Sequence, residues 1–271
     1  MQSLADSFRR EGRTIGFVPT MGFLHAGHVS LMGRAKQECD VVVASIFVNP
    51  TQFGPGEDLD RYPRDEEGDR KKCEAAGVAV LFMPTAAEMY PEKPSVFVDV
   101  EGISDILEGA VRPGHFRGVA TVVSKLFHLV KPHKAFFGQK DYQQCAIIKR
   151  MVKGLDMDVE VVVLPTVREP DGLAMSSRNS YLSADERLKA ATIPRALSAA
   201  EQLAKTGARD PDALKNKMRT VLRAEKGIEI DYLEIADPES LAPLASAQDR
   251  MVLLIAVRIG RTRLIDNIVI L

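Results

Sequence analysis

The sequence predicts an α/β protein, with a doubly wound parallel sheet over residues 1–180 and a smaller α+β domain over residues 181–271. Two observations carry this prediction. Up to residue 82, short apolar runs alternate with helical patterns, and the run Val41–Phe47 is continuous and β-branched, as in a parallel strand covered on both faces. Beyond residue 180, two helical patterns precede three apolar runs, so the βαβ alternation ends there.

The elements of the first domain follow from apolar periodicity and from turn residues. We expect helices at 3–11, 28–38, 66–76, 103–108, 119–130 and 142–152. We expect strands at 14–18, 41–47, 78–82, 96–100, 135–137 and 159–164. Gly12 ends the first helix, and Pro19 ends the first strand because its ring removes a backbone donor.

The second domain opens with a capping box, in which Ser183 and Glu186 begin an alanine-rich helix that extends to about residue 205. Asp210 and Pro211 cap and start a further helix to about residue 225. Three strands are expected at 228–235, 251–259 and 263–270. We therefore predict a sheet with two helices packed against it.

Composition narrows the class of protein. With 45% hydrophobic and 27% charged residues the chain resembles ordinary globular proteins, and its net charge of −1 argues against nucleic acid or an anionic membrane as partner. The three cysteines form no CxxC pattern, which is typical of a reducing compartment. The N-terminal residues do not resemble a signal peptide, and no apolar run approaches the length of a membrane span. A cytoplasmic protein is expected.

The segment 16–36, GFVPTMGFLHAGHVSLMGRAK, carries the clearest chemical signal. It runs from a strand through a glycine-bearing turn into a helix, and a helix N-terminus attracts anions through its free N–H groups and its dipole. His25 and His28 lie on one face of that helix, where both can donate to phosphate oxygens. The alternatives are a zinc pair or two surface histidines. Zinc needs further ligands, and no other cluster has ligand spacing, so we favour phosphate.

The string Pro19–His28, PTMGFLHAGH, resembles the HxGH signature of the nucleotidyltransferase superfamily and, over its full length, the pantothenate synthetase family. Four further strings resemble the same family: SIFVNPTQF, FGQKDYQQ, MSSRN and RLIDN. The resemblance implies a Rossmann-like nucleotidyltransferase domain. It also implies that ATP and pantoate form pantoyl adenylate and pyrophosphate, after which β-alanine attack gives pantothenate and AMP. A homodimer and an ATP-bound Mg²⁺ are implied as well. Family members usually begin earlier with an extra strand, which predicts a shortened N-terminus here.

The resemblance also implies roles for individual residues. The catalytic set that would hold the triphosphate and stabilise the leaving pyrophosphate is His25, His28, Lys140, Ser176, Ser177 and Arg178. Further ATP contacts are expected from Met21, Gly22, Phe23, Leu24, Ala26, Gly27, Gly138, Gln139, Asp141, Val167 and Met175. Neutral amides that donate and accept at once would bind the hydroxylated acid pantoate and β-alanine, namely Asn49, Gln52 and Gln144.

Asp69 is the one candidate Mg²⁺ ligand, because it lies in the acidic helix of the family; a plain surface carboxylate is an equal alternative. His115 and Arg117 are equally balanced between chemistry and loop anchoring, whereas His128 and His133 are expected to have no chemical role.

Two other functions remain open at this point. A nucleotidyltransferase acting on a phosphorylated cofactor precursor would need more cationic groups than the amide-rich set supplies. A regulator that has lost catalysis would be expected to lack members of the phosphate-binding set, yet all are present. The near-neutral charge also disfavours a tRNA-charging enzyme, another user of the HxGH signature.

Overall fold

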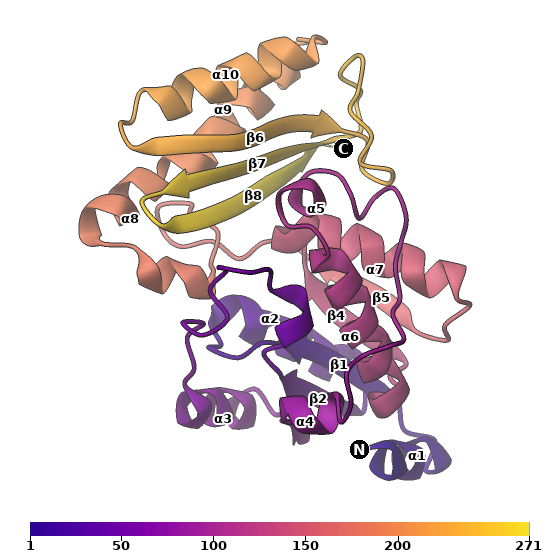
Figure 1. The fold of residues 1–271 in the computed structure, drawn as a ribbon. Coiled ribbons are helices and arrows are strands. Elements are labelled where there is room, and N and C mark those ends of the chain that lie inside the picture. Colours follow the sequence, from indigo (N-terminus) through magenta and orange to yellow (C-terminus); the bar gives the residue numbers. More distant parts are fainter. Residues whose placement is uncertain (271) are drawn as a thin grey trace. The chain divides into compact units, whose positions relative to one another are not determined.

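A computed structural model describes residues 1–270 and contains two compact units (Figure 1). The first unit comprises residues 1–139 and 143–165, and the second comprises residues 140–142 and the chain from Thr166 onward. Residues 166–180, which the sequence assigns to the first domain, group with the second unit.

The first unit is built on a five-stranded parallel sheet in the order β3-β2-β1-β4-β5 (Figure 1). Its strands are β1 (Ile15–Thr20), β2 (Val41–Ile46), β3 (Val80–Phe82), β4 (Lys134–Gly138) and β5 (Glu160–Leu164). Strand order runs outward from β1 in both directions, which confirms the doubly wound sheet.

Helices cover both faces of this sheet, as the alternation of side chains along β1 shows. Val18 packs in a buried cluster with Met32 of α2 (Ala26–Glu38) and Cys73 of α3 (Glu66–Ala75). The neighbouring Phe17 points to the opposite face and meets Phe127 of α6 (His115–Val130) edge to face, with ring centroids 6.4 Å apart. The remaining helices of this part of the chain are α1 (Gln2–Arg10), α4 (Ala86–Met89), α5 (Glu108–Val111) and α7 (Tyr142–Gly154).

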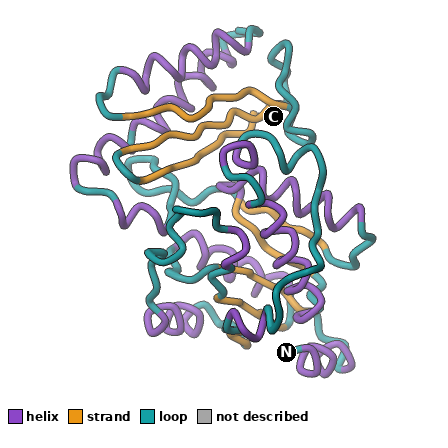
Figure 2. Tube along the Cα trace, in the orientation of Figure 1, coloured by secondary structure: helices purple, strands orange, loops and turns teal. Residues whose placement is uncertain are grey.

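The segment between α4 and α5 departs from prediction and is a long irregular connection (Figure 2). The expected strand at 96–100 is absent, because the backbone of Val98 bonds to the Thr121 hydroxyl (2.9 Å) and not to a neighbouring strand. The expected helix at 103–108 is also wrong, since turns occupy this stretch until α5 begins at Glu108. In addition, α6 starts at His115, earlier than predicted.

The second unit has an antiparallel sheet in the order β6-β7-β8, which confirms the α+β prediction. The strands are β6 (Ile228–Ala236), β7 (Met251–Ile259) and β8 (Thr262–Ile270), and the helices are α8 (Ala184–Ala190), α9 (Thr192–Lys205) and α10 (Pro211–Arg223). The single helix expected from 183 to 205 is divided at Ala191. Pro194 explains the division, because it cannot donate to the carbonyl of Ala190 and its ring crowds that carbonyl.

Candidate active site

Three predicted site segments of the first unit follow neighbouring parallel strands. The turn that leads to His25 follows β1, Asn49 and Gln52 follow β2, and Gly138 ends β4. The carboxyl ends of parallel strands lie at the same edge of a sheet, and ligands bind at that edge where the strand order reverses. Here the reversal falls between β1 and β4. The fold therefore places these segments where an open α/β sheet binds its ligand.

The turn after β1 needs a glycine and a buried carboxylate. Gly22 has φ +82°, and a Cβ there would lie 2.9 Å from Ile46 Cγ2, so only glycine fits. Phe23 also takes a left-handed conformation, with φ 50°. Asp69, only 1% exposed, accepts hydrogen bonds of 2.7 Å from the backbone amides of Phe23 and Leu24. The carboxylate thus anchors the turn that leads into the histidine pair.

His25 and His28 cap the N-terminus of α2 together. The Nδ1 of His25 accepts from the Gly27 amide (3.1 Å), and the Nδ1 of His28 accepts from the His25 amide (3.2 Å). Because a backbone amide can only donate, both Nδ1 atoms are unprotonated and the neutral rings carry their protons on Nε2. The ring centroids are 4.1 Å apart. The pair therefore supplies two neighbouring N–H donors at a helix N-terminus, an arrangement suited to an anion.

Asn49 organises the amide cluster after β2. Its Oδ1 accepts from the Tyr90 hydroxyl (2.9 Å) and from the Thr51 amide (3.3 Å). Its Nδ2 donates to Gln52 Oε1 (3.1 Å) and to the Gly118 carbonyl (3.2 Å). Asn49 is 1% exposed and its hydrogen-bonding capacity is used within the protein. It can reach a substrate only by giving up one of these bonds.

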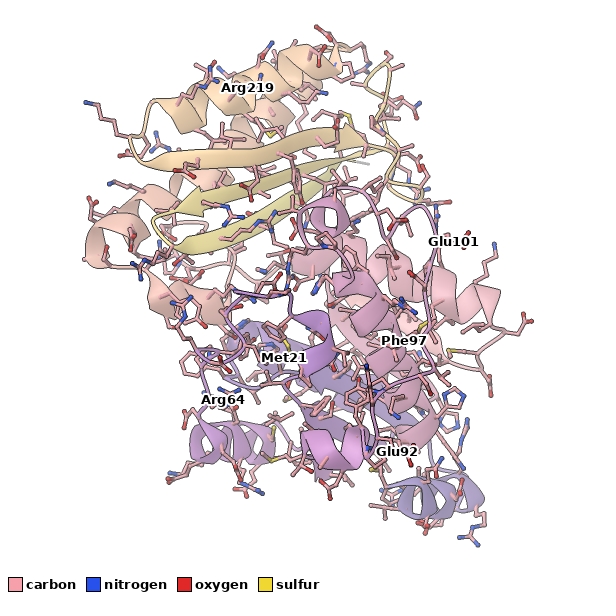
Figure 3. All side chains as sticks on the ribbon, in the orientation of Figure 1. Met21, Arg64, Glu92, Phe97, Glu101 and Arg219 are labelled. Carbon is pink, nitrogen blue, oxygen red and sulfur yellow. The ribbon has the colours of Figure 1, made fainter. Side chains whose placement is uncertain are left out.

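Gln52 ends the short helix η1 (Pro50–Gln52), and its amide is oriented by its neighbours. Because Oε1 accepts from Asn49, the NH₂ group points the other way and contacts Met21 Sδ at 3.2 Å; Met21 is labelled in Figure 3. A thioether sulfur is a weak acceptor, so an oxygen of a ligand can replace it readily. Gln52 therefore offers a donor.

Two adjacent glutamines on α7 have different surroundings. Gln143 is buried, donates to the carbonyls of Ile103 and Ile106 (both 2.8 Å) and accepts from the Glu108 amide (3.0 Å). It anchors the irregular segment that precedes α5, a role the sequence analysis missed. Gln144, the predicted substrate ligand, is partly exposed, and within residues 1–270 its side-chain amide has no hydrogen-bond partner.

In the second unit, Lys140 and the segment that leads to Ser176 are both tied to β8. Asn267, 1% exposed, donates to the Lys140 carbonyl (2.9 Å). Asp266 holds Arg168 through two bonds of 2.6 and 3.0 Å, and Arg168 donates in turn to the Gly172 carbonyl (3.0 Å). The RLIDN string thus supports the backbone of a predicted catalytic lysine.

The SSRN segment forms the helix η3 (Ser177–Tyr181). Ser176 caps it by accepting from the Arg178 amide (3.3 Å), and Asn179 donates to the Ala174 carbonyl (3.1 Å) and to Glu169 (2.7 Å). Upstream, the Met175 amide donates to the Val167 carbonyl (3.0 Å). The segment is therefore anchored at both ends and carries hydroxyl and guanidinium donors between them.

A second supporting group surrounds the backbone of Gln52. His115 donates from Nδ1 to the Gln52 carbonyl (2.8 Å) and accepts on Nε2 from Arg112 (3.0 Å). Burial and the nearby Arg112 charge lower the pKa of His115 from 6.5 to about 4, so the ring is neutral near pH 7. His115 is therefore a loop anchor, one of the two readings that the sequence left open.

Within residues 1–270, no group of three or more His, Cys, Asp or Glu side chains is placed to hold a metal ion. Both oxygens of Asp69 accept from backbone amides, and its Oδ1 lies 3.8 Å from Nζ of Lys72. In the same residues, no helix is long and apolar enough to span a membrane.

Comparison with known proteins gives consistent matches over nearly the whole chain. The family model described as pantoate-beta-alanine ligase matches residues 1–269. The pantothenate synthetase of Acetivibrio thermocellus is 52% identical over 259 residues, covering 96% of this chain and 92% of the relative. That of Herpetosiphon aurantiacus is 55% identical over 262 residues, with 96% and 95% coverage.

Solved structures agree with these matches. The pantothenate synthetase of Thermus thermophilus superposes with a TM-score of 0.93 at 50% identity, covering 97% of this chain and 96% of that chain. The pantoate-beta-alanine ligase of Francisella tularensis, complexed with beta-gamma ATP and beta-alanine, superposes with a TM-score of 0.81 at 36% identity, with 98% and 95% coverage.

Proposed function

The chain belongs to the pantoate–β-alanine ligase family, and from this premise we propose how its residues divide the reaction among themselves. The enzyme condenses pantoate with β-alanine at the expense of ATP, through pantoyl adenylate, and releases AMP and pyrophosphate. One observation carries the residue assignment. The capped histidine pair and the amide cluster follow neighbouring strands, so phosphate donors and an amide donor lie at one edge of the sheet.

In the first step a pantoate carboxylate oxygen attacks the α-phosphorus of ATP, and the bond to the β-phosphate oxygen breaks. Charge repulsion opposes this attack, and negative charge accumulates on the departing pyrophosphate. The Nε2–H groups of His25 and His28 would donate to the phosphate oxygens. Lys140, Ser176, Ser177 and Arg178 would add further donors. In this proposal, most of the rate acceleration in this step comes from positioning of the reactants and from stabilisation of the developing charge.

The remaining predicted ATP contacts keep their assignment in this proposal. Asp141 would accept from a ribose hydroxyl, and backbone groups of the loops would contact the nucleotide. These loop residues are Met21, Gly22, Phe23, Leu24, Ala26, Gly27, Gly138, Gln139, Val167 and Met175.

Pantoate recognition would depend on Gln52 and Gln144. Gln52 presents its NH₂ group, which suits a carboxylate or hydroxyl oxygen of pantoate. Gln144 can donate and accept through the same amide. Asn49 would act by holding Gln52 in this orientation. The set contains no cation, which suits a substrate without a phosphate better than a phosphorylated precursor.

In the second step the neutral amine of β-alanine attacks the acyl carbon of pantoyl adenylate. The C–N bond forms, the C–O bond to the AMP phosphate breaks, and the amine loses a proton. Pyrophosphate takes no part in this step. Groups that stabilise pyrophosphate should therefore matter little here, and this distinction makes the two halves of the reaction separable by experiment.

We further propose that ATP enters as its Mg²⁺ complex, with the phosphates and water supplying most of the ligands. Asp69 remains the candidate protein ligand, since a carboxylate with two amide bonds keeps lone pairs for another bond. The enzyme would act as a homodimer in the cytoplasm, a compartment that suits its free thiols Cys39, Cys73 and Cys145.

A product assay tests the proposal directly. Purified enzyme should convert ATP, pantoate and β-alanine into equal amounts of AMP and pantothenate, and omission of any one substrate should abolish pantothenate formation. Formation of ADP in place of AMP would contradict adenylate chemistry. Turnover of phosphopantoate in preference to pantoate would favour a site for phosphorylated precursors.

A further inference from the structure

We propose that Glu57, Arg112 and His115 form a positioning relay that fixes the backbone of Gln52 and thereby sets the affinity of the enzyme for pantoate. The inference rests on the proposed role of Gln52 as a pantoate ligand. No member of the relay needs to touch the substrate, because each acts through the carbonyl of Gln52 or through the next member.

The hydrogen bonds of the relay have a defined direction. The Gln52 carbonyl can only accept, so the Nδ1 of His115, at 2.8 Å, must carry the ring proton. The Nε2 of His115 then accepts from Nη1 of Arg112 at 3.0 Å, and Nη2 of Arg112 also reaches the Gln52 carbonyl at 3.4 Å. Arg112 is in turn paired with Glu57 through two bonds of 2.9 and 2.5 Å.

The backbone at Gln52 depends on such outside support. The helix η1 has only three residues, and the hydrogen bonds at its end are long. The Gln52 amide lies 3.4 Å from the Asn49 carbonyl, and the Phe53 amide lies 3.3 Å from the Pro50 carbonyl. Because Arg112 and Glu57 are largely buried, with side-chain exposures of 16% and 24%, their ion pair is less screened than a surface pair.

The relay holds the main chain of Gln52, whereas the side-chain amide of Gln52 is the proposed pantoate donor. Asn49 fixes the side chain of Gln52, while His115 and Arg112 fix its main chain. A donor held at two points can meet a pantoate oxygen at hydrogen-bond distance. A shift of the main chain by about 1 Å would misplace that donor, and misplacement on this scale can cost up to about 10²-fold in activity.

His115 is poorly suited to acid–base catalysis. Both ring nitrogens are occupied within the protein. Glu57 and Glu108 favour a proton on the ring, but burial and Arg112 oppose them and hold the pKa of His115 at about 4. A neutral imidazole with two committed nitrogens is a structural connector, and its effect on the reaction must pass through Gln52.

Three variants test the relay, with KM measured separately for pantoate and for ATP in pantoate-dependent pyrophosphate exchange. In His115→Phe the ring shape remains without either hydrogen bond. His115→Asn keeps a side-chain N–H where Nδ1 stood. Glu57→Gln removes the charge that holds Arg112 and leaves the histidine in place. His128→Phe is the matched control, because His128 lies on the same helix and its Nδ1 bonds to the Ser124 carbonyl at 2.7 Å.

We expect His115→Phe to raise the KM for pantoate about tenfold or more, with the KM for ATP changed less than about twofold. His115→Asn should recover most of the pantoate affinity, Glu57→Gln should show an intermediate loss, and His128→Phe should match the wild type. Equal losses for both substrates, or an Asn variant as impaired as the Phe variant, would overturn the relay. If His115→Phe does not fold, the KM values of Glu57→Gln and His115→Asn test the relay. Glu57→Gln with an unchanged KM for pantoate would then overturn it.

The same assay separates this inference from the proposed function. Wild-type enzyme that fails to use pantoate would refute the function itself. A wild-type enzyme that uses pantoate normally, and whose Gln52→Ala variant loses pantoate affinity while His115→Phe does not, would refute the relay alone.

Discussion

Asp69 illustrates how one buried side chain can shape the turn that leads into a candidate site. Its carboxylate accepts hydrogen bonds from the amides of Phe23 and Leu24. In this turn Gly22 and Phe23 both have positive φ values. A left-handed conformation is easy for glycine but costly for Phe23 unless the surroundings hold it in place. The turn leads directly into the His25 cap, so the position of the histidine pair depends on this carboxylate.

Asp69→Asn should damage both stability and adenylation. Asparagine keeps the size but offers one acceptor, so its NH₂ group would face a backbone amide donor. We expect a loss of about 1–3 kcal/mol in the free energy of unfolding and a lower kcat for pyrophosphate exchange. Glu67→Gln, an exposed change on the same helix, is the control for urea unfolding and kinetics. A variant of normal stability that needs more Mg²⁺ would show instead that Asp69 acts as a metal ligand.

His28→Ala and Lys140→Ala should impair adenylate formation more than substrate affinity. Contacts that strengthen as charge moves to pyrophosphate lower kcat, whereas uniform binding contacts raise KM. Loss of one donor of this type costs about 2.7–4 kcal/mol, or 10²–10³ in rate. Preformed pantoyl adenylate should therefore restore much of the activity of both variants. Single-turnover kinetics of each half-reaction provide the measurement, and equal losses in both halves would refute the assignment to pyrophosphate.

At the scale of elements, the approach of α6 to η1 determines where the amide cluster lies. A Cβ on Gly118 would fall 2.5 Å from the Thr51 carbonyl oxygen and 2.7 Å from Gln52 Cα. Both are backbone atoms, so neither can turn aside. The close packing that brings Asn49 to the Gly118 carbonyl therefore requires glycine at this position.

A matched pair of glycine substitutions in helices tests this packing. Gly118→Ala should lower the free energy of unfolding by about 1–3 kcal/mol and weaken pantoate binding. Gly33→Ala, in α2, meets no atom within 4 Å and should raise stability by about 0.4–1 kcal/mol. Urea unfolding of both variants gives the comparison. If both substitutions were stabilising, α6 and η1 would not be in the close contact described.

Elements with a strong local signal were predicted from the sequence, whereas those set by distant contacts were not. The apolar run of β2 and the periodicity of α2 are visible in a short window. The backbone of Val98, by contrast, takes its partner from Thr121, 23 positions away. The break at Ala191 did have a local signal, because Pro194 is the third residue of α9, but the prediction did not use it.

For the candidate site, too, the residues that lie in motifs were predicted, whereas most residues that hold them in place were not. Motif strings pointed to the residues expected to contact substrates, including His28 and Gln52. The supporting residues Tyr90 and Gln143 could not be recognised, because each acts on a partner more than 30 positions away in the chain. For His115 the sequence left loop anchoring as one of two alternatives, but it could not name the partner, the Gln52 carbonyl. Sequence patterns thus predict candidates for chemistry more readily than the bonds that hold them in place.

At the scale of the whole molecule, stability should depend on pH through His115. Its pKa is about 4 in the folded protein against an ordinary value of 6.5, so between these values the unfolded chain binds the proton and the folded protein does not. The free energy of unfolding should therefore fall as pH decreases from about 6.5 to about 4. His115→Asn should show a smaller fall than wild type in urea unfolding at pH 7 and pH 5. If the variant and the wild type lost the same free energy of unfolding between pH 7 and pH 5, the pKa of His115 in the folded protein would not be lowered.

The enzyme activates pantoate with ATP in a step that is separate from amide formation and does not need β-alanine. Exchange of labelled pyrophosphate into ATP tests this separation most directly, because reversible adenylate formation returns the label without completing the reaction. We predict exchange that requires pantoate, proceeds without β-alanine and is lost when pantoate is omitted. Exchange that appears only when β-alanine is added would contradict the two-step account.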